Sequence, residues 1–251
     1  MSYGSKIEWT DATWNPVRGC TKISPGCKNC YAERFAERFR GVPGHPFEQG
    51  FDIRLVPEKL DLPRRWRAPL RIFVNSMSDL FHSSVPTDYI ESVGRVMEAA
   101  HWHTFQILTK RHERMQELLN GELFWMGRLK NIWWGVSVED RKYGLPRVEA
   151  LRRTNAGLRF LSIEPLLEDL GEFDLNNIDW VIVGGESGIN YRPVAAEWVR
   201  NLHELCQAAD VPFFFKQWGG RTPKQNGRVL DGQIRNGMPG RESRMRRCHD
   251  S

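Results

Sequence analysis

Three cysteines lie within one short stretch near the start of the sequence: Cys20, Cys27 and Cys30, spaced C-x6-C-x2-C. Pro25 and Gly26, which lie between them, are typical of a loop rather than of a packed core. Thiolates so close in sequence are soft ligands that suit a zinc ion or an iron–sulfur cluster. We therefore predict that the three cysteines bind a metal centre.

Three interpretations of these thiols differ in the ligands that they require. A structural zinc ion normally has four protein ligands, and His45 is the nearest candidate for a fourth beside the three cysteines. Buried free thiols are a second interpretation, which fits Cys206 better because it lies in an apolar helical pattern. A cubane iron–sulfur cluster with three thiolate ligands keeps one iron open for a substrate or cofactor. We favour the cluster and keep zinc as the alternative.

The bulk composition is that of an ordinary globular protein. The chain has 251 residues, of which 40% are hydrophobic and 27% charged, enough for one large domain with a core. No apolar run approaches the ~20 residues that span a bilayer. The N-terminal residues show no signal-peptide pattern, so we expect a cytoplasmic protein without a membrane partner. An odd number of cysteines, five, without a secretory signal argues against a disulfide framework.

Positive charge is concentrated at the C-terminus. The net charge is +5, and residues 221–251 alone carry eight Lys/Arg and three Asp/Glu, so the preceding 220 residues sum to zero. Such a basic tail is either a solvated, disordered segment or a contact for the phosphates of a nucleic acid. The arginines that favour the second interpretation are Arg241, Arg244, Arg246 and Arg247.

Short apolar runs alternate with amphipathic helical patterns along most of the chain. The apolar runs are 71–75, 104–108, 132–136, 159–163, 180–183 and 212–215, after a first short strand within 7–19. The helical patterns include 31–40, 88–100, 111–119, 145–153 and 195–209. This alternation predicts parallel strands covered by helices, with about seven units. We expect an α/β protein, a partial or complete parallel (β/α) barrel over residues 1–220 followed by a basic tail over 221–251; a doubly wound open sheet is the runner-up.

Polar residues follow every predicted strand. In β/α barrels, chemistry collects at the C-terminal ends of the strands, so these residues and the cysteine loop predict a polar cup. Glu164 and Glu186 are the strongest candidates because each directly follows a predicted strand whose apolar sequence is typical of a buried strand. Gly184 and Gly185 would allow a ligand to approach the backbone closely. The full set of candidate binding residues is Ser78, Asp79, Ser137, Glu139, Glu164, Gly184, Gly185, Glu186 and Lys216.

The cysteine loop resembles that of the radical S-adenosylmethionine enzymes, in the branch that contains spore photoproduct lyase. Over about residues 7–220 the chain is more closely similar to the phage Gp37/Gp68 (DUF5131) family. Segment 26–32 carries the resemblance to the lyase branch, and the segments that carry the resemblance to the phage family are Thr13–Pro16 before Gly19-Cys20, then 162–166, 184–188 and 215–219. The usual pattern of radical enzymes is C-x3-C-x2-C, and the first gap here is longer by three residues. We expect Pro25 and Gly26 to form a small bulge that absorbs them.

The resemblance implies a fold, two cofactors and a reaction type. The fold would be a TIM-like β/α barrel, and Cys20, Cys27 and Cys30 would bind a [4Fe–4S] cluster. S-adenosylmethionine would bind the open iron, and an external electron donor would reduce the cluster to give a 5′-deoxyadenosyl radical. Ser78 and Asp79 would contact the methionine amino group, and Ser137 and Glu139 would contact the ribose.

The substrate is not specified by these motifs. The lyase-like loop and the basic tail favour a nucleic acid or a nucleotide. A non-catalytic protein with a structural zinc site, which binds DNA or a protein partner, is the main alternative. An enzyme that uses its cluster as a Lewis acid is the other.

Overall fold

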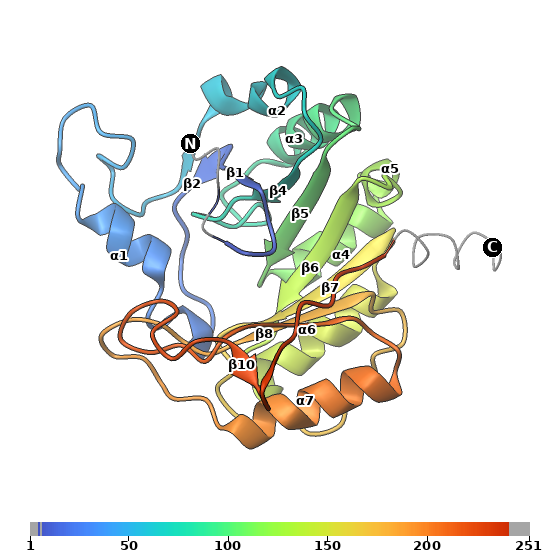
Figure 1. Ribbon diagram of the computed structural model, residues 1–251. Helices are drawn as coiled ribbons and strands as arrows, with labels where there is room; N and C mark the ends of the chain where they lie inside the picture. Colours follow the sequence, from blue (N-terminus) through green and yellow to red (C-terminus); the bar gives the residue numbers. More distant parts are fainter. Residues whose placement is uncertain (1–4, 6, 241–251) are drawn as a thin grey trace. The chain divides into compact units, whose positions relative to one another are not determined.

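The computed structural model describes residue 5 and residues 7–240 (Figure 1). Seven strands belong to one sheet in the order β1-β4-β5-β6-β7-β8-β9. They are β1 (Ala12–Trp14), β4 (Arg71–Val74), β5 (Thr104–Thr109), β6 (Ile132–Ser137), β7 (Leu158–Ile163), β8 (Trp180–Gly184) and β9 (Phe213–Gln217). Two small antiparallel pairs are β2 (Val17–Arg18) with β3 (Arg54–Leu55), and β10 (Val229–Leu230) with β11 (Gln233–Ile234).

Helices separate most of the strands of the main sheet. The α-helices are α1 (Tyr31–Glu37), α2 (Leu62–Arg65), α3 (Thr87–Ala99), α4 (His112–Asn120), α5 (Phe124–Gly127), α6 (Arg141–Arg153) and α7 (Ala196–Ala208). Two 3-10 turns are η1 (Pro25–Cys27) and η2 (Pro57–Lys59). Among the described residues, no helix combines the length and the apolar character needed to cross a membrane.

The strand order confirms the predicted fold class. Successive strands of the main sheet are neighbours, and the assigned pairs are parallel, as in a β/α barrel. A doubly wound sheet would reverse its strand order at a switch point, and this order has no reversal. Because β1 and β9 lie at the two ends of the order, the described strands form a partial barrel.

The chain divides into two compact units. The first comprises Met1–Gly135 and Thr154–Gly157, and the second comprises Val136–Arg153 and Leu158–Ser251. The expected boundary at residue 220 stays a prediction. Residues on its far side hydrogen-bond to β9, since Phe215 N donates to Arg235 O at 3.0 Å and Gly237 N donates to Phe213 O at 2.9 Å. Residues 241–251, with the four arginines of the basic tail, lie outside the described part.

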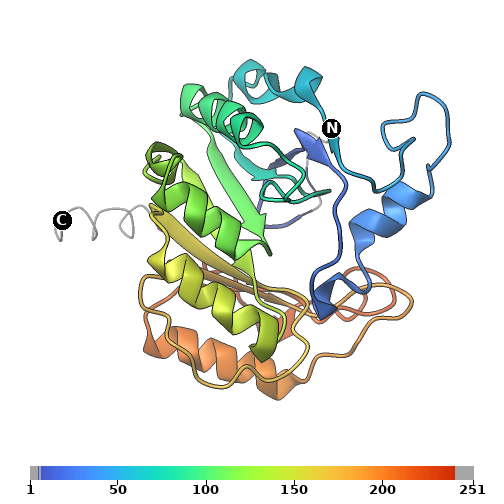
Figure 2. The ribbon, with the colours of Figure 1, turned by 180° about the vertical axis from the view of Figure 1, so that it is seen from behind.

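In the first unit, α3 and α4 lie on the same face of β4 and β5 (Figure 2). Helix α3 begins after Pro86, which suits a helix start, and it buries one stripe of residues spaced by three or four. That stripe consists of Ile90, Val93, Gly94, Val96 and Met97. Burial of this stripe ties the helix to the sheet, so that the ends of β1, β4 and β5 have fixed positions within the unit.

In the second unit, α6 and α7 lie on the same face of β7, β8 and β9 (Figure 2). Every residue of β8 is buried, as expected for a strand with both faces covered. Trp180 of β8 lies between Phe160 and Phe214 of the flanking strands, with ring centroids 5.7 and 6.2 Å away. These aromatic contacts fix the strands whose ends carry Glu164, Gly184 and Lys216.

Candidate functional site: a thiol-rich loop and the polar strand ends

The cysteine loop begins at a glycine that no other residue can replace without a clash. Gly19 has a φ of +82°, and a Cβ atom there would lie 2.2 Å from Asp52 O. The next residue is fixed by its backbone, because Cys20 N donates to Phe51 O at 3.1 Å. This close approach of two backbones explains the sequence Gly19-Cys20 and sets the position of the first thiol.

The other two thiols follow from two short helical elements. Cys27 ends η1, where its N–H donates to Ser24 O at 2.9 Å. The longer first gap of the loop therefore contains a compact 3-10 turn, in line with the expected bulge. Cys30 immediately precedes α1 and occupies its N-cap position. The first turn of a helix has free N–H groups and a partial positive charge, which favour an anionic group such as a thiolate.

An arginine from a distant part of the chain contacts the loop. Arg111, 91 residues away, donates from Nη1 to Cys20 Sγ at 3.4 Å. Its Nη2 donates to Thr21 O at 3.0 Å and to Thr21 Oγ1 at 3.1 Å. Asp79 holds the same guanidinium through Nη1 at 2.9 Å. The loop thus has a fixed cation beside its first thiol.

Burial and local charge act in opposite directions on the thiols. The pKa of Cys20 is raised to about 11, mainly by burial and also by the charge of Asp79, while Arg111 acts to lower it. Burial likewise raises the pKa of Cys30, while the backbone N–H groups of Glu33 and Ala32 lower it. The charge of Cys27 raises the pKa of both Cys20 and Cys30. Binding of a cation is the ordinary way to stabilise neighbouring thiolates in such a setting.

The three loop thiols are free and partly exposed, whereas Cys206 in α7 is buried, as predicted. Cys20, Cys30 and Met77 pack against a small apolar cluster formed by Ala32, Ala36, Phe47 and Phe51. In the part of the chain that the structure describes, no three or more His, Cys, Asp or Glu side chains are grouped so that they could share one metal ion. His45, the candidate fourth zinc ligand, stacks on Phe39 with ring centroids 3.7 Å apart.

Ser78 and Asp79 lie beside the cysteine loop in the first unit. The Ser78 hydroxyl donates to Val17 O at 2.7 Å, so it ties the segment after β4 to β2. Asp79 is buried, and its carboxylate accepts four hydrogen bonds: from Thr109 Oγ1, from the backbone N–H groups of Phe81 and Lys110, and from Arg111. Its visible role is to hold Arg111 against Cys20.

Ser137 is the last residue of β6 and Glu139 lies two residues beyond it in the second unit, and both are buried. Arg147 of α6 donates to Ser137 O at 2.8 Å and forms an ion pair with Glu139. The Glu139 side chain is 0% exposed and that of Arg147 is 3% exposed. The carboxylate is therefore enclosed and neutralised by its own chain, an arrangement that the sequence alone did not predict.

Glu164 and Lys216 are brought together from the ends of β7 and β9. Lys216 Nζ donates to Glu164 Oε1 at 2.7 Å, and both side chains are partly exposed. Gly184 makes room for this pair, because a Cβ atom there would lie 2.7 Å from Glu164 Oε1. Of the polar strand ends in this unit, this pair is the one that keeps access to solvent on both partners.

Gly185 and Glu186 are engaged by neighbouring segments. A Cβ atom on Gly185 would lie 2.1 Å from Trp218 O, so the absence of a side chain accommodates the chain itself. Glu186 is buried and accepts two hydrogen bonds from the guanidinium of Arg192, from Nε at 3.0 Å and from Nη2 at 2.5 Å. The space that the two glycines were expected to offer a ligand holds Glu164 and Trp218 in this structure.

Arg111 is a candidate functional residue that the sequence did not single out. It comes after a predicted strand, behind Thr109 and Lys110, and this position at a polar strand end was the one feature of the sequence that could have indicated it. His82 was also missed: its Nε2 lies 2.9 Å from Thr21 Oγ1 in the loop. Nothing in the sequence pairs residues so far apart.

The topology and the loop together define a parallel β/α-barrel protein with a thiol-rich loop after its first strand. The chain belongs to the family described as protein of unknown function (DUF5131), whose model it matches over residues 4–239. The predicted resemblance to this family is thereby confirmed.

Other comparisons are more distant. No curated protein matches the sequence. Solved structures of spore photoproduct lyase are similar at a low level. A mutant form has a TM-score of 0.47 and 12% identity, covering 82% of this chain and 63% of that chain. The complex with dinucleoside spore photoproduct has a TM-score of 0.47 and 14% identity, covering 80% and 62%. This chain thus spans less than two thirds of the length of those chains.

Proposed function

We propose that Cys20, Cys27 and Cys30 bind a [4Fe–4S] cluster and that the protein is a radical S-adenosylmethionine enzyme. One observation carries this proposal: a single short loop supplies three free, partly exposed thiols and has an arginine 3.4 Å from one of them. Three thiolates and a cubane cluster form a negatively charged assembly, for which Arg111 and the N-terminus of α1 are suitable partners.

The proposal rests on the chemistry and chain positions of the thiols. The apolar cluster around Cys20 and Cys30 would shield one side of the metal centre from water, and burial is one of the means by which proteins adjust cluster potentials. When bound, the cluster would supply the electron that splits S-adenosylmethionine into methionine and a 5′-deoxyadenosyl radical. The chain's own tasks would be to hold the cofactor and to exclude water.

The candidate contacts for S-adenosylmethionine differ in how available they are. Asp79, Glu139 and Glu186 each hold an arginine, so in this proposal they act by fixing neighbouring segments. Glu164 and Lys216 are partly exposed and are the better candidates for direct polar contact with the cofactor. Ser78, Ser137, Gly184 and Gly185 would contribute backbone groups at the strand ends.

Anaerobic reconstitution of the full chain tests the proposal. We expect about four irons with matching sulfide and absorbance at roughly 400 nm. With dithionite and S-adenosylmethionine, 5′-deoxyadenosine should form, measured by chromatography. One zinc and no iron would overturn the enzyme in favour of a zinc protein. A cluster without deoxyadenosine formation would indicate Lewis-acid use of the open iron.

Two cysteine variants provide a matched pair. Cys27→Ala removes a proposed ligand from a partly exposed turn, so iron and deoxyadenosine formation should be lost while the far-ultraviolet spectrum is retained. Cys206→Ala removes a thiol from the core of α7 and should leave the iron content unchanged. Equal iron content in both variants would contradict the three-thiolate assignment.

A further inference from the structure

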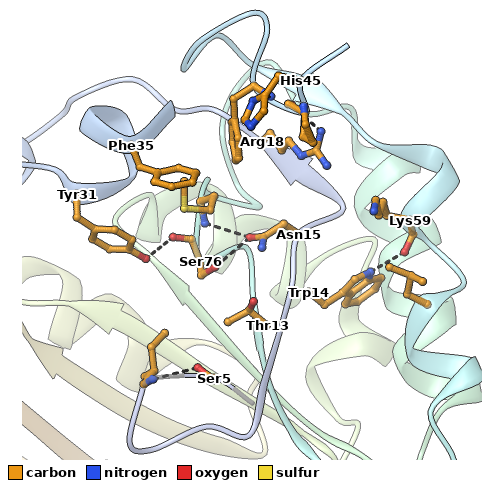
Figure 3. Close-up of a pocket in the computed structure, with 15 residues that line it drawn as sticks. Ser5, Thr13, Trp14, Asn15, Arg18, Tyr31, Phe35, His45, Lys59 and Ser76 are labelled. Atoms are coloured by element: carbon orange, nitrogen blue, oxygen red, sulfur yellow. Dashed lines mark hydrogen bonds between the residues drawn. The ribbon is translucent and has the colours of Figure 1, made fainter. Parts of the chain in front are cut away.

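A pocket of about 700 Å³ lies in the first unit, beside the start of α1 (Figure 3). Fifteen residues line it, including Tyr31, which directly follows Cys30, and Met77, which packs against the same apolar cluster as Cys20 and Cys30. Its volume is within the range of small-molecule sites. None of the residues proposed above to bind the cluster or S-adenosylmethionine lines it, so its chemistry is a separate question.

The polar lining of this pocket is basic. Arg18, His45 and Lys59 contribute to it, and none of its fifteen lining residues is acidic. His45 Nδ1 accepts a hydrogen bond from Phe47 N at 3.1 Å, so Nε2 carries the proton and can donate. The Lys59 ammonium has no ion-pair partner among the described residues. The charge of the lining therefore suits an anion.

Two arginines face each other next to the pocket at a cost in stability. In the β2–β3 pair, Arg18 is directly opposite Arg54, and like charges in that relation are destabilising. Arg18 uses Nη1 to donate to Pro46 O at 2.7 Å, which occupies one of its five donors. Within the described residues neither arginine has a carboxylate in ion-pair range, and Glu58 acts on Arg18 only at longer range. An anion between the guanidinium groups would relieve their repulsion.

Two exposed aromatic rings project from α1 at the same pocket (Figure 3). Tyr31 is 58% exposed and Phe35 is 44% exposed, unusual values for large aromatic residues on a short helix. Both rings are held in place. Tyr31 Oη donates to Ser76 O at 2.5 Å, and Phe35 makes edge contacts with Phe39 and Phe47 at 5.2 and 5.7 Å. Fixed, exposed rings beside a cationic site are suited to stack on a flat ring of a ligand.

We propose that this pocket binds a nucleoside phosphate. Its phosphate would be held by Arg18, which lines the pocket, and by Arg54, which is paired opposite Arg18 outside the lining, and its base would stack on Phe35 and Tyr31. The nucleoside phosphate is either a free nucleotide or one unit of a single-stranded nucleic acid, because both present the same groups. That this ligand is the substrate rests on the proposed function. The binding site itself does not, because none of its contacts involves the metal centre.

Fluorescence anisotropy with the full chain tests the site. The probe is a labelled single-stranded DNA of about ten nucleotides, and the competitors are deoxynucleoside 5′-monophosphates and inorganic phosphate. Displacement by monophosphates at concentrations similar to those of the unlabelled strand assigns a free nucleotide. Displacement only by the strand assigns a nucleic acid. No binding of either, or displacement by inorganic phosphate as effective as by nucleotides, would overturn the proposal.

Charge and ring variants separate the two halves of the site. Arg18→Gln and Phe35→Leu should each weaken binding about tenfold, through a lost charged hydrogen bond and lost stacking respectively. For a strand, Arg18→Gln should also reduce the slope of log affinity against log salt by about one. The matched control is Arg153→Gln on α6, which removes an exposed charge from the other unit and should leave affinity unchanged. Equal affinity of all three variants would overturn the site.

Two further measurements keep the result independent of folding and of the cluster. Arg54→Gln should weaken binding and yet unfold at the same or a higher temperature, because it removes the repulsion with Arg18. A lower melting temperature with unchanged binding would show that Arg54 is structural. Cys27→Ala should lose iron but keep nucleotide binding. Failure of the cluster and failure of this pocket are thus separate outcomes.

Discussion

The thiol-rich loop of the first unit and the polar strand ends of the second unit differ in whether their ionisable groups have a partner of opposite charge. In the second unit, Glu139, Glu164 and Glu186 each form an ion pair with a basic residue of the same unit. In the first unit, three thiols are free, and the adjacent pocket has three basic residues and no acidic one. Unbalanced charge is costly to keep, so it is the better indicator of a binding site.

The same comparison separates residues that occupy similar positions in the sequence but have different surroundings in the structure. Glu139 and Glu164 both follow buried strands, yet the first is enclosed with Arg147 and the second reaches solvent with Lys216. When the partner of a carboxylate is buried, removing the carboxylate destabilises the fold because it leaves the partner's charge unpaired. Such a carboxylate is occupied by its partner and does not bind a ligand. Four predictions test this contrast between a neutralised and an unbalanced region.

The largest effect is expected where an ion pair is fully buried. Glu139→Gln should lower the free energy of unfolding by about 3–5 kcal/mol, because it leaves the Arg147 charge buried without its partner. Urea denaturation followed by circular dichroism measures this loss. Glu139→Leu combined with Arg147→Met removes both charges and should recover much of it. A loss below about 1 kcal/mol for the single variant would mean that this pair is not enclosed.

A smaller loss is expected at the glycine that starts the cysteine loop. Gly19→Ala should lower the free energy of unfolding by about 2–3 kcal/mol, since it combines a strained positive φ with a clash against Asp52 O. Gly41→Ala is the matched control. Its φ is also positive, +77°, but nothing lies within 4 Å of the new Cβ, so only the strain remains, about 1 kcal/mol. Equal losses for the two variants would remove the close backbone approach from the explanation.

Arg111→Gln tests the cation beside the first thiol. We expect the free energy of unfolding to fall by only about 1–2 kcal/mol, because Asp79 keeps its hydrogen bonds from Thr109, Phe81 and Lys110. The pKa of Cys20, about 11 with Arg111 present, should rise because the arginine lowers it. Alkylation of Cys20 at alkaline pH, followed by mass spectrometry, should therefore be slower. Alkylation as fast as in the Arg153→Gln control would contradict the contact.

The smallest effect concerns pH and two buried histidines. Burial lowers the pKa of His82 and of His103. The Nδ1 atom of each accepts a backbone hydrogen bond, from Ser84 N and from Leu70 N respectively. The unfolded chain therefore binds protons first as the pH falls below about 6.5, and stability is lost as the pH falls further.

Urea unfolding at successive pH values measures this dependence. His103→Asn keeps an acceptor for Leu70 N but cannot titrate, so it should flatten the loss below neutral pH. His101→Gln, at an exposed position, is the control and should not change it. A wild-type protein whose stability rises as the pH falls from neutral would contradict the assignment of neutral, buried histidines.

The regular elements were largely predictable because their signals are local. The apolar runs at 104–108 and 132–136 became β5 and β6, and the helical pattern at 88–100 became α3, within one residue at most ends. The short β2–β3 pair and α5 were not predicted, because two-residue strands and a single helical turn leave almost no periodic pattern. The candidate thiols were visible because their spacing is a property of the sequence itself.

The sequence by itself determined the thiol-rich loop, the alternation of strands and helices, and the family. Those features depend on residue spacing over short distances, which the chain carries in any conformation. Only the tertiary structure decided that Arg111 contacts Cys20 across 91 positions and that Arg18 opposes Arg54. It also decided that Glu139 is enclosed by Arg147 whereas Glu164 remains accessible. Such pairings arise from strand order and register, which bring distant residues together and have no periodic signature in the sequence.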